Sequence, residues 1–254
     1  MKNFKKGVYF QLVALFVTCS IWAQDNQPTM FTVHTDNVKF NKIMQYEEAA
    51  KELKSNFEKH NINDVSWTAL SIEDGRYVYV SAIENMAELD KNIMAGLYEK
   101  MGEEAADAMF EKMDECYDSH SNSIVHYLPK MSYHPESEGS MEGKNHREYH
   151  FLYYAPKNAK AMKEGMMEIH DMFKNRNIKN GYSVYHSGFG SPESYYMVSI
   201  TAKDGLEIAQ NGKLNDETFT EEDQAKFFEV IQLTTRYDKV EGRLRPDLSY
   251  YPKN

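Results

Sequence analysis

Two histidines occupy matching positions in the chain and carry the side chain best suited to acid–base chemistry. His34 lies in residues 30–36 and His150 lies in residues 148–155, and both segments have the alternating pattern of a β-strand. An imidazole changes its charge near neutral pH, so a histidine beside phenols can transfer a proton or bind an anionic group. We therefore predict that His34 and His150 are catalytic candidates.

Other polar side chains on predicted strands could join these histidines. The candidates for ligand binding are His126, His186, Arg147 and Tyr182. Side chains alternate between the two faces of a strand, so His34 lies opposite Phe31. If the face of Phe31 packs against helices, the histidines line the interior of the fold. Two alternatives stay open: the histidines hydrogen-bond within a filled core, or the two faces are exchanged.

A metal site or a heme is a weaker interpretation of the histidines. His146 and His150 have the His-x-x-x-His spacing that holds zinc on a helix. Residues 147–154 are predicted as a strand, where positions four apart lie about 13 Å from each other and do not share one ion. His170 lies on a predicted helix without a heme-binding motif around it. The sequence therefore predicts no metal ligands and no cofactor.

No familiar catalytic motif assigns a reaction. The sequence contains no Cys-x-x-Cys, no His-Glu-x-x-His, no phosphate-binding glycine loop and no Gly-x-Ser-x-Gly. Its many tyrosines and phenylalanines suit both strand packing and the binding of flat ligands. Evidence on function must therefore come from the elements that position the histidines and the aromatic rings.

Composition limits the class of protein. The chain has 254 residues and a formal net charge of −10, with 29 Lys and Arg against 39 Asp and Glu. A chain of this length forms one large domain or two smaller ones and buries a core without disulfides. Nucleic-acid binding depends on clustered Lys and Arg, so the acidic balance argues against a nucleic-acid partner.

The first 23 residues have the pattern of a secretory signal peptide. Three lysines within the first six residues precede an apolar run, and Ala23 is the small residue before the expected cleavage point. The run has about 11 residues, fewer than the ~20 that a membrane-spanning helix needs. The Ala23-Gln24 junction resembles that of exported Bacteroidetes-type proteins, so we expect a periplasmic or secreted protein. Cleavage leaves Cys116 as the single cysteine, at the spacing of a buried apolar residue.

The chain contains an internal repeat. At an offset of 116 residues, the residues Phe57, Asn61, Ile62 and His34 recur as Phe173, Asn177, Ile178 and His150. The sequence Pro-x-x-Ser-Tyr-x-Pro ends both copies, at residues 129–135 and 246–252. Such self-similarity indicates duplication of one structural unit. We expect a first repeat at residues 24–136, a linker at 137–146 and a second repeat at 147–254.

Both copies have the same predicted order of elements, β-α-β-β-α-β. In the first copy the strands are 30–36, 65–72, 77–83 and 123–127, and the helices are 42–60, 86–101 and 103–117. In the second copy the strands are 148–155, 182–187, 195–201 and 243–248, and the helices are 159–176, 205–210 and 221–236. This order is the split β-α-β unit of ferredoxin-like, α+β folds.

The tandem order resembles the dimeric α/β-barrel superfamily in a fused, two-copy form. The resemblance implies two antiparallel sheets, each covered by helices on one face, whose open faces close against each other as a pseudo-dimeric barrel. Relatives of that shape include antibiotic-biosynthesis-type monooxygenases, muconolactone isomerase-like proteins and heme enzymes of the chlorite dismutase type. The resemblance covers nearly all of the chain after residue 23, and it transfers no catalytic residue because no signature motif accompanies it.

Three kinds of function are compatible with this architecture. The first is an exported barrel that binds a small molecule in its lumen, with no reaction assigned. The second is a cofactor-independent enzyme that uses histidine and tyrosine acid–base chemistry in the lumen, of the isomerase, monooxygenase or lyase type. The third is partner binding through the acidic surface and the linker. We favour the first, because fold does not determine function and no catalytic set is assignable.

Overall fold

The computed structural model describes residues 29–252, and the predicted signal peptide lies outside this range. The first half contains β1 (Thr29–Val38), α1 (Ile43–His60), β2 (Thr68–Ile72), β3 (Arg76–Ile83), α2 (Ala95–Met101), α3 (Glu103–Asp114) and β4 (Tyr117–Tyr127). The second half contains β5 (His146–Tyr154), α4 (Ala159–Asn175), β6 (Ser183–Ser187), β7 (Tyr195–Ala202), α5 (Gly205–Thr218), α6 (Glu221–Gln232) and β8 (Thr234–Leu244). Both halves therefore have the predicted β-α-β-β-α-β order, with α2 or α5 as an additional helix.

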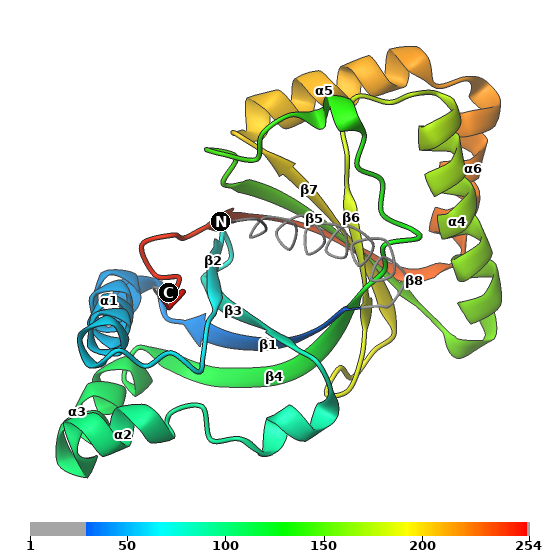
Figure 1. The fold of residues 1–254 in the computed structure, drawn as a ribbon. Helices are drawn as coiled ribbons and strands as arrows, with labels where there is room; N and C mark the ends of the chain where they lie inside the picture. The colour runs from blue at the N-terminus through cyan, green and yellow to red at the C-terminus, as the bar shows by residue number, and fades with distance from the viewer. Residues whose placement is uncertain (1–28, 253–254) are drawn as a thin grey trace, which may run out of the picture.

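The eight strands form one closed barrel with the order β1-β3-β2-β8-β5-β7-β6-β4 (Figure 1). Within each half the first strand lies between the third and fourth strands, which is the ferredoxin-like order. The two sheets join where β2 pairs with β8 and where β4 pairs with β6, and every pairing is antiparallel. The prediction of two ferredoxin-like repeats closed face to face into a barrel is confirmed.

Helices cover the outside of the barrel in two layers (Figure 1). The first half is covered by α1, α2 and α3, which bury Tyr46, Phe57 and Met109 against the sheet. The second half is covered by α4, α5 and α6, and its core includes the buried side chain of Met162. Cys116 is a free, buried member of the first core, as the sequence predicted.

The helices that follow β1 and β5 end in the same way. Asn61 after α1 and Asn177 after α4 both have a left-handed conformation, with φ of 51° and 50°. Asparagine tolerates this conformation better than most residues. The next backbone N–H then donates to the carbonyl of Phe57 or Phe173, at 3.1 Å in both halves. The repeated residues therefore form a repeated helix end.

The fourth strand of each half begins earlier than the sequence predicted. β4 begins at Tyr117 rather than at 123, and β8 begins at Thr234 rather than at 243. The first residues of both strands are polar and mostly exposed, so no apolar alternation marked them as strand. The predicted helix 86–101 is divided into a 3-10 turn at Met86–Asp90 and α2, and α5 extends beyond its predicted end.

The serines of the two Pro-x-x-Ser-Tyr-x-Pro tails bind across the halves. Ser132, which follows β4 of the first half, accepts a hydrogen bond from the backbone N–H of Val184 in β6 at 2.8 Å. Ser249, which follows β8 of the second half, accepts one from the backbone N–H of Ala69 in β2 at 2.9 Å. Each serine hydroxyl therefore accepts a hydrogen bond from a backbone N–H group in a strand of the other half.

The tyrosines of the tails repeat this exchange. The hydroxyl of Tyr133 donates to the carbonyl of Ile178 at 2.9 Å, and the hydroxyl of Tyr250 donates to the carbonyl of Ile62 at 2.6 Å. Both acceptors lie just after the first helix of the opposite half. The repeated tail motif is therefore a structural device that closes the core of the partner half.

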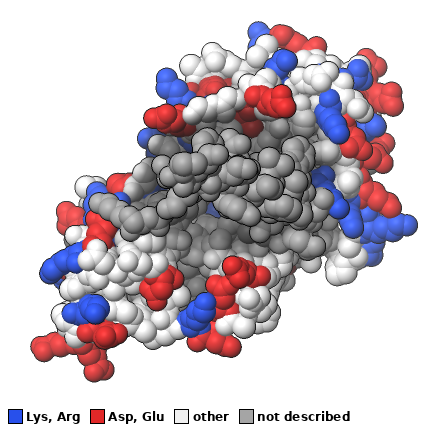
Figure 2. Space-filling view, viewed as in Figure 1, with Lys and Arg blue, Asp and Glu red and all other residues white. Residues whose placement is uncertain are grey.

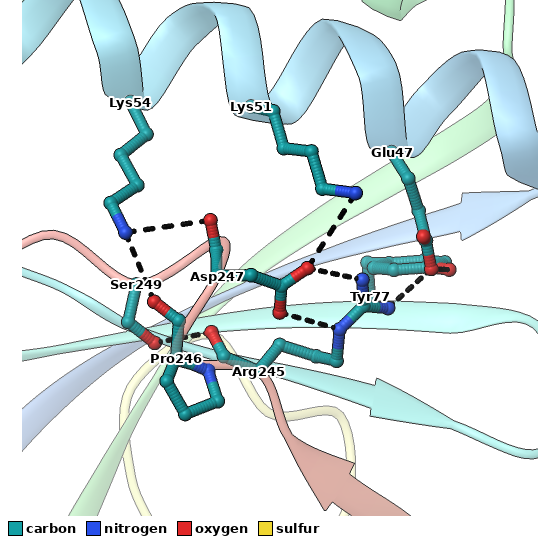
Figure 3. Close-up of polar contacts among 8 residues, drawn as sticks. All are labelled: Glu47, Lys51, Lys54, Tyr77, Arg245, Pro246, Asp247 and Ser249. Atoms are coloured by element: carbon teal, nitrogen blue, oxygen red, sulfur yellow. Dashed lines mark hydrogen bonds and ion pairs between the residues drawn. The ribbon is translucent and has the colours of Figure 1, made fainter.

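An ion-pair network fixes the second tail to α1 (Figure 3). Arg245 pairs with Glu47 of α1 and with Asp247 of the tail, the latter at 2.7 Å. The hydroxyl of Tyr77 donates to Glu47 at 2.6 Å, and Lys54 donates to the tail backbone. The Arg245 guanidinium lowers the pKa of both carboxyl groups. The tail is therefore held by charge as well as by packing.

Charged side chains of both signs are interspersed over the helical layers on the face drawn in Figure 2. Acidic residues outnumber basic residues in the chain, yet this face presents no continuous surface of one sign over the helices.

Within residues 29–252, no helix is both long and apolar enough to cross a bilayer. The expectation that the chain has no nucleic-acid partner stays a prediction.

Candidate functional site

The two faces of β1 have different surroundings. Asp36 is 2% exposed and contacts Tyr46 of α1, so its face of the strand lies under the helices. Phe31, on the opposite face, packs edge-on against Tyr185 of β6 with ring centroids 6.2 Å apart. Because side chains alternate along a strand, His34 shares the face of Asp36. His34 therefore points toward the helical layer.

The second half has the same arrangement. His150 shares a face with Leu152 and Tyr154, which are buried against α4 and its neighbours. The expectation that His34 and His150 line the lumen is therefore wrong. The alternation correctly identified which residues share a face, but it could not tell which face the helices cover, and the aromatic face lines the lumen instead.

Three of the predicted ligand-binding residues also lie away from the lumen. His126 and His186 are register partners where β4 meets β6, and they share the outward face of Val184, a core residue. Nε2 of His186 lies 2.7 Å from the hydroxyl of Tyr154, and burial lowers the pKa of His186. Tyr182 is buried in the second core. These side chains have structural contacts and do not gather at one site.

Arg147 is the predicted binding residue that does face the lumen. Its Nη1 donates to the backbone carbonyls of Lys144 and His146, at 2.6 and 2.9 Å. Burial lowers the pKa of the guanidinium, and its electrostatic partners are the hydroxyls of Tyr149 and Tyr185. Among residues 29–252, no carboxylate forms an ion pair with it. A half-buried cation therefore lies in the lumen, and none of residues 29–252 forms an ion pair with it.

Aromatic rings line the lumen around this cation. Tyr185 contacts Phe31 and Tyr127, with ring centroids 6.2 and 5.4 Å apart. Further along β5 is a second aromatic group, formed by Phe151, Tyr153 and Tyr195. Arg236 lies over the ring of Tyr153 at 3.8 Å from its centroid. The interior therefore offers flat apolar surface on both sides of the barrel axis.

Some side chains that face the lumen keep contact with solvent. Phe31, Val33, Tyr149 and Phe151 are half-buried, whereas Leu70 and Val125 on the same inner face are buried. An eight-stranded barrel is just wide enough to be filled by its own side chains or to hold one small ligand. The half-buried apolar and aromatic side chains are the lumen surface that a small ligand could contact.

A compact polar cluster lies on the outer face of β1 and β4. Nε2 of His34 lies 3.0 Å from Oδ1 of Asp36, and its Nδ1 lies 2.8 Å from Oδ1 of Asn122. Asp36 raises the pKa of His34 and also accepts a hydrogen bond from Tyr46 at 2.5 Å. His120 completes the group, because the ligand atoms of His34, Asp36 and His120 all lie within 4.8 Å of one another.

The sequence predicted no metal ligands, and it missed this cluster. His120 was assigned no element because the fourth strand was expected to begin only at 123. The offset of 117 that aligns the two tails also aligns His120 with Tyr237, which bonds to His150. The sequence alone did not place His120 beside His34, because the register of β1 and β4 brings them together.

The second half has a different cluster at the matching place. Nε2 of His150 lies 2.8 Å from Oε1 of the buried Glu148, and Nδ1 lies 2.5 Å from the hydroxyl of Tyr237. Burial lowers the pKa of His150. The ammonium of Lys239 lies 2.5 Å from the other oxygen of Glu148. Nε2 of His146 lies 3.5 Å from Oε2 of Glu241, and Oε1 of Glu241 lies 3.9 Å from the ammonium of Lys239.

Solved structures of other proteins have the same fold. A provisionally assigned monooxygenase from Lactobacillus acidophilus matches with a TM-score of 0.52 and 9% identity, over 89% of this chain and 97% of its own. An anthrone oxidase-like protein matches with a TM-score of 0.53 and 9% identity, over 85% of this chain and 91% of its own. A provisionally assigned monooxygenase from Fusobacterium nucleatum matches with a TM-score of 0.50 and 13% identity, over 89% and 98%.

No protein-family model and no curated protein matches the sequence. At identities of 9 to 13%, the structural likeness establishes the dimeric α/β-barrel fold in its two-copy form. The likeness assigns neither a reaction nor a ligand to this chain, because one fold can carry many functions.

Proposed function

We propose that this chain binds a small aromatic anion inside the barrel and that Arg147 is the anchor for the negative group. The observation that carries the proposal is the half-buried guanidinium of Arg147, which has no carboxylate partner within residues 29–252. A buried charge is costly unless an opposite charge compensates it. Arginine also presents planar, paired donors that match a carboxylate. A ligand carboxylate would supply the missing charge.

The neighbours of Arg147 favour an aromatic ligand. Tyr185, whose hydroxyl acts on the Arg147 guanidinium, forms a half-buried group of rings with Phe31 and Tyr127. Aromatic rings prefer edge-to-face or offset contacts with other rings. Tyr149 adds a hydroxyl on the same face of β5. The combination of one cation, hydroxyls and flat surface is suited to an aromatic carboxylate.

The enzymatic alternative has less support from the residues. His34 and His150 face the helices and are separated from the lumen by the sheet. Burial raises the pKa of the Tyr149 hydroxyl, so at neutral pH this group donates hydrogen bonds and is not a base. We therefore propose binding and assign no reaction.

The experiment is a binding measurement with defined probes. Benzoate, salicylate and 4-hydroxybenzoate are titrated into the purified chain by calorimetry, and benzamide serves as the uncharged analogue. We expect the carboxylates to bind and benzamide to bind more weakly. Arg147→Gln should weaken carboxylate binding by about 10- to 100-fold, because a hydrogen bond to a charged group contributes about 1.5–3 kcal/mol. Benzamide affinity should change little.

Arg243 provides the matched control. It lies on β8 with its side chain exposed on the outer face of the barrel. Arg243→Gln removes the same charge from the protein, so it separates a specific contact from a change in net charge. Equal carboxylate affinity in wild type, Arg147→Gln and Arg243→Gln would refute the proposed anchor, and absence of binding by every probe carboxylate would refute the ligand class.

We also propose that the protein is exported and that cleavage near Ala23 produces the mature chain. The support is the charged, apolar and small-residue order of the first 23 residues. N-terminal sequencing of protein recovered from the periplasm or medium should begin at Gln24. A chain that keeps Met1 and stays in the cytoplasm would contradict export.

A further inference from the structure

The strongest unassigned feature is the polar cluster outside the lumen, on β1 and β4. Asp36 and His120 are register partners on these strands, and His34 is two residues before Asp36 on the same face. Their ligand atoms all lie within 4.8 Å of one another. Two imidazole nitrogens and one carboxylate oxygen form a donor set that transition-metal ions prefer.

The buried carboxylate of Asp36 is incompletely compensated. Asp36 is 2% exposed, and its Oδ1 has no hydrogen-bond partner among residues 29–252. Nε2 of His34 lies 3.0 Å from Oδ1, and this imidazole is charged only when it is protonated. Asp36 also forms no ion pair with lysine or arginine in this part of the chain. A buried acceptor of this kind requires an explanation.

In the second half, a lysine of the protein itself compensates the charge of a buried carboxylate. There the buried carboxylate of Glu148 contacts the ammonium of Lys239 at 2.5 Å as well as His150. The residue that pairs with His34 in the corresponding register is Asn122, which carries no charge. Among residues 29–252, the first half therefore has the carboxylate and the histidine but no lysine or arginine beside them.

Neighbouring groups orient the donor atoms toward a common point. Asn122 accepts a hydrogen bond from Nδ1 of His34, which leaves a lone pair on Nε2 in the neutral ring. Tyr46 donates to Oδ2 of Asp36, which leaves Oδ1 free. Outer contacts of this kind fix the tautomer and orientation of ligands in metal sites.

We propose that His34, Asp36 and His120 bind a divalent first-row transition-metal ion. Zinc bonds to nitrogen and oxygen are about 2.0–2.2 Å long, so two adjacent ligand atoms lie about 3.0 Å apart at a right angle and about 3.4 Å apart at the tetrahedral angle. The 3.0 Å separation of Nε2 and Oδ1 lies at the short end of this range. His120 is exposed and supplies the third ligand from the solvent side. Water completes the coordination. Two imidazoles favour zinc or iron over calcium and magnesium, which prefer oxygen ligands.

This inference is independent of the proposed lumen ligand, because the cluster lies on the opposite face of the sheet. The test uses untagged chain treated with a chelator and dialysed. Zn²⁺ is titrated by calorimetry, and Co²⁺ is titrated in parallel because its visible spectrum reports coordination. We expect one equivalent of either ion to bind. His120→Ala should weaken binding by more than the about 10- to 100-fold that loss of an outer contact costs.

Two further variants decide between this site and others. Asn122→Ala removes only the outer contact to His34 and should weaken Zn²⁺ binding by about 10- to 100-fold. His150→Ala removes the equivalent histidine of the second half and should leave Zn²⁺ affinity unchanged. The proposal is overturned if neither ion binds, if His120→Ala binds Zn²⁺ like wild type, or if His150→Ala loses binding to the same extent. Circular dichroism of each variant verifies folding, since His120 is exposed and its removal leaves the core intact.

Discussion

Removal of one hydroxyl tests whether the exchanged tails stabilise the fold. Tyr250 is 3% exposed, and its hydroxyl donates to the carbonyl of Ile62 at 2.6 Å. Phenylalanine at this position keeps the ring contacts with Phe57 and Trp67, whose centroids lie 5.4 and 5.0 Å away. The change therefore removes one hydrogen bond and leaves a buried carbonyl without this donor. Such a loss costs about 1–3 kcal/mol.

Urea unfolding of Tyr250→Phe, followed by circular dichroism, measures this loss as a lower midpoint at unchanged slope. For a chain of this size, each kcal/mol lowers the melting temperature by roughly 2–4 °C. Tyr133→Phe should have a comparable effect, because Tyr133 makes the corresponding bond in the other half.

The neighbouring Tyr251 supplies the control. Its ring is 60% exposed and its hydroxyl contacts Thr68 at the surface. Tyr251→Phe should therefore cost less than about 0.5 kcal/mol. If Tyr250→Phe and Tyr251→Phe were equally stable, the tail would not be held by the buried bond, and our account of the repeated Ser-Tyr pair would fail.

Three further changes probe the packing and charge of the fold. Leu248→Ala removes a side chain that is 1% exposed in the first core and should lower the free energy of unfolding by about 2–5 kcal/mol in urea. Gly165→Ala places a Cβ 2.6 Å from Cγ2 of Val230, and we expect a loss of about 1–3 kcal/mol from overpacking to exceed the helix-propensity gain of about 1 kcal/mol; Val230→Ala in the same chain should restore stability. The pKa of Glu47 is lowered by Arg245, so its contribution to stability is present above the ordinary pKa of 4.5 and is lost as pH falls through the lowered value of the folded state. Glu47→Gln should therefore flatten the acid side of a stability-against-pH curve, and an unchanged curve would contradict the ion pair.

Local sequence patterns predicted the fold where burial is one-sided. The spacing of Tyr46, Ala50, Leu53 and Phe57 specified the helix now seen as α1, since these side chains are buried on one face. The duplication then supplied the topology, because two copies of an incomplete sheet have open faces to cover. The early parts of β4 and β8 were missed because strand pairing, and not apolar alternation, makes them strands.

The candidate site was harder to predict, and the reason is geometric. Alternation correctly separated His34 from Phe31, but orientation toward the lumen depends on which face the helices cover, and that is decided by tertiary packing. Arg147 was placed among the binding candidates from the sequence. It faces the lumen, and its binding role stays a prediction. The contact between His34 and His120 joins residues 86 apart in the chain, so only the register of β1 and β4 brings them together.

The crossed tails have a consequence for synthesis. The first half to leave the ribosome depends for its own closure on Leu248 and Tyr250, which are translated after every strand and helix of the second half. The usual order, in which an early domain matures while the rest is still being made, is therefore unavailable to this chain. A nascent polypeptide that stalls just after β8 would have a complete second half but an open first one.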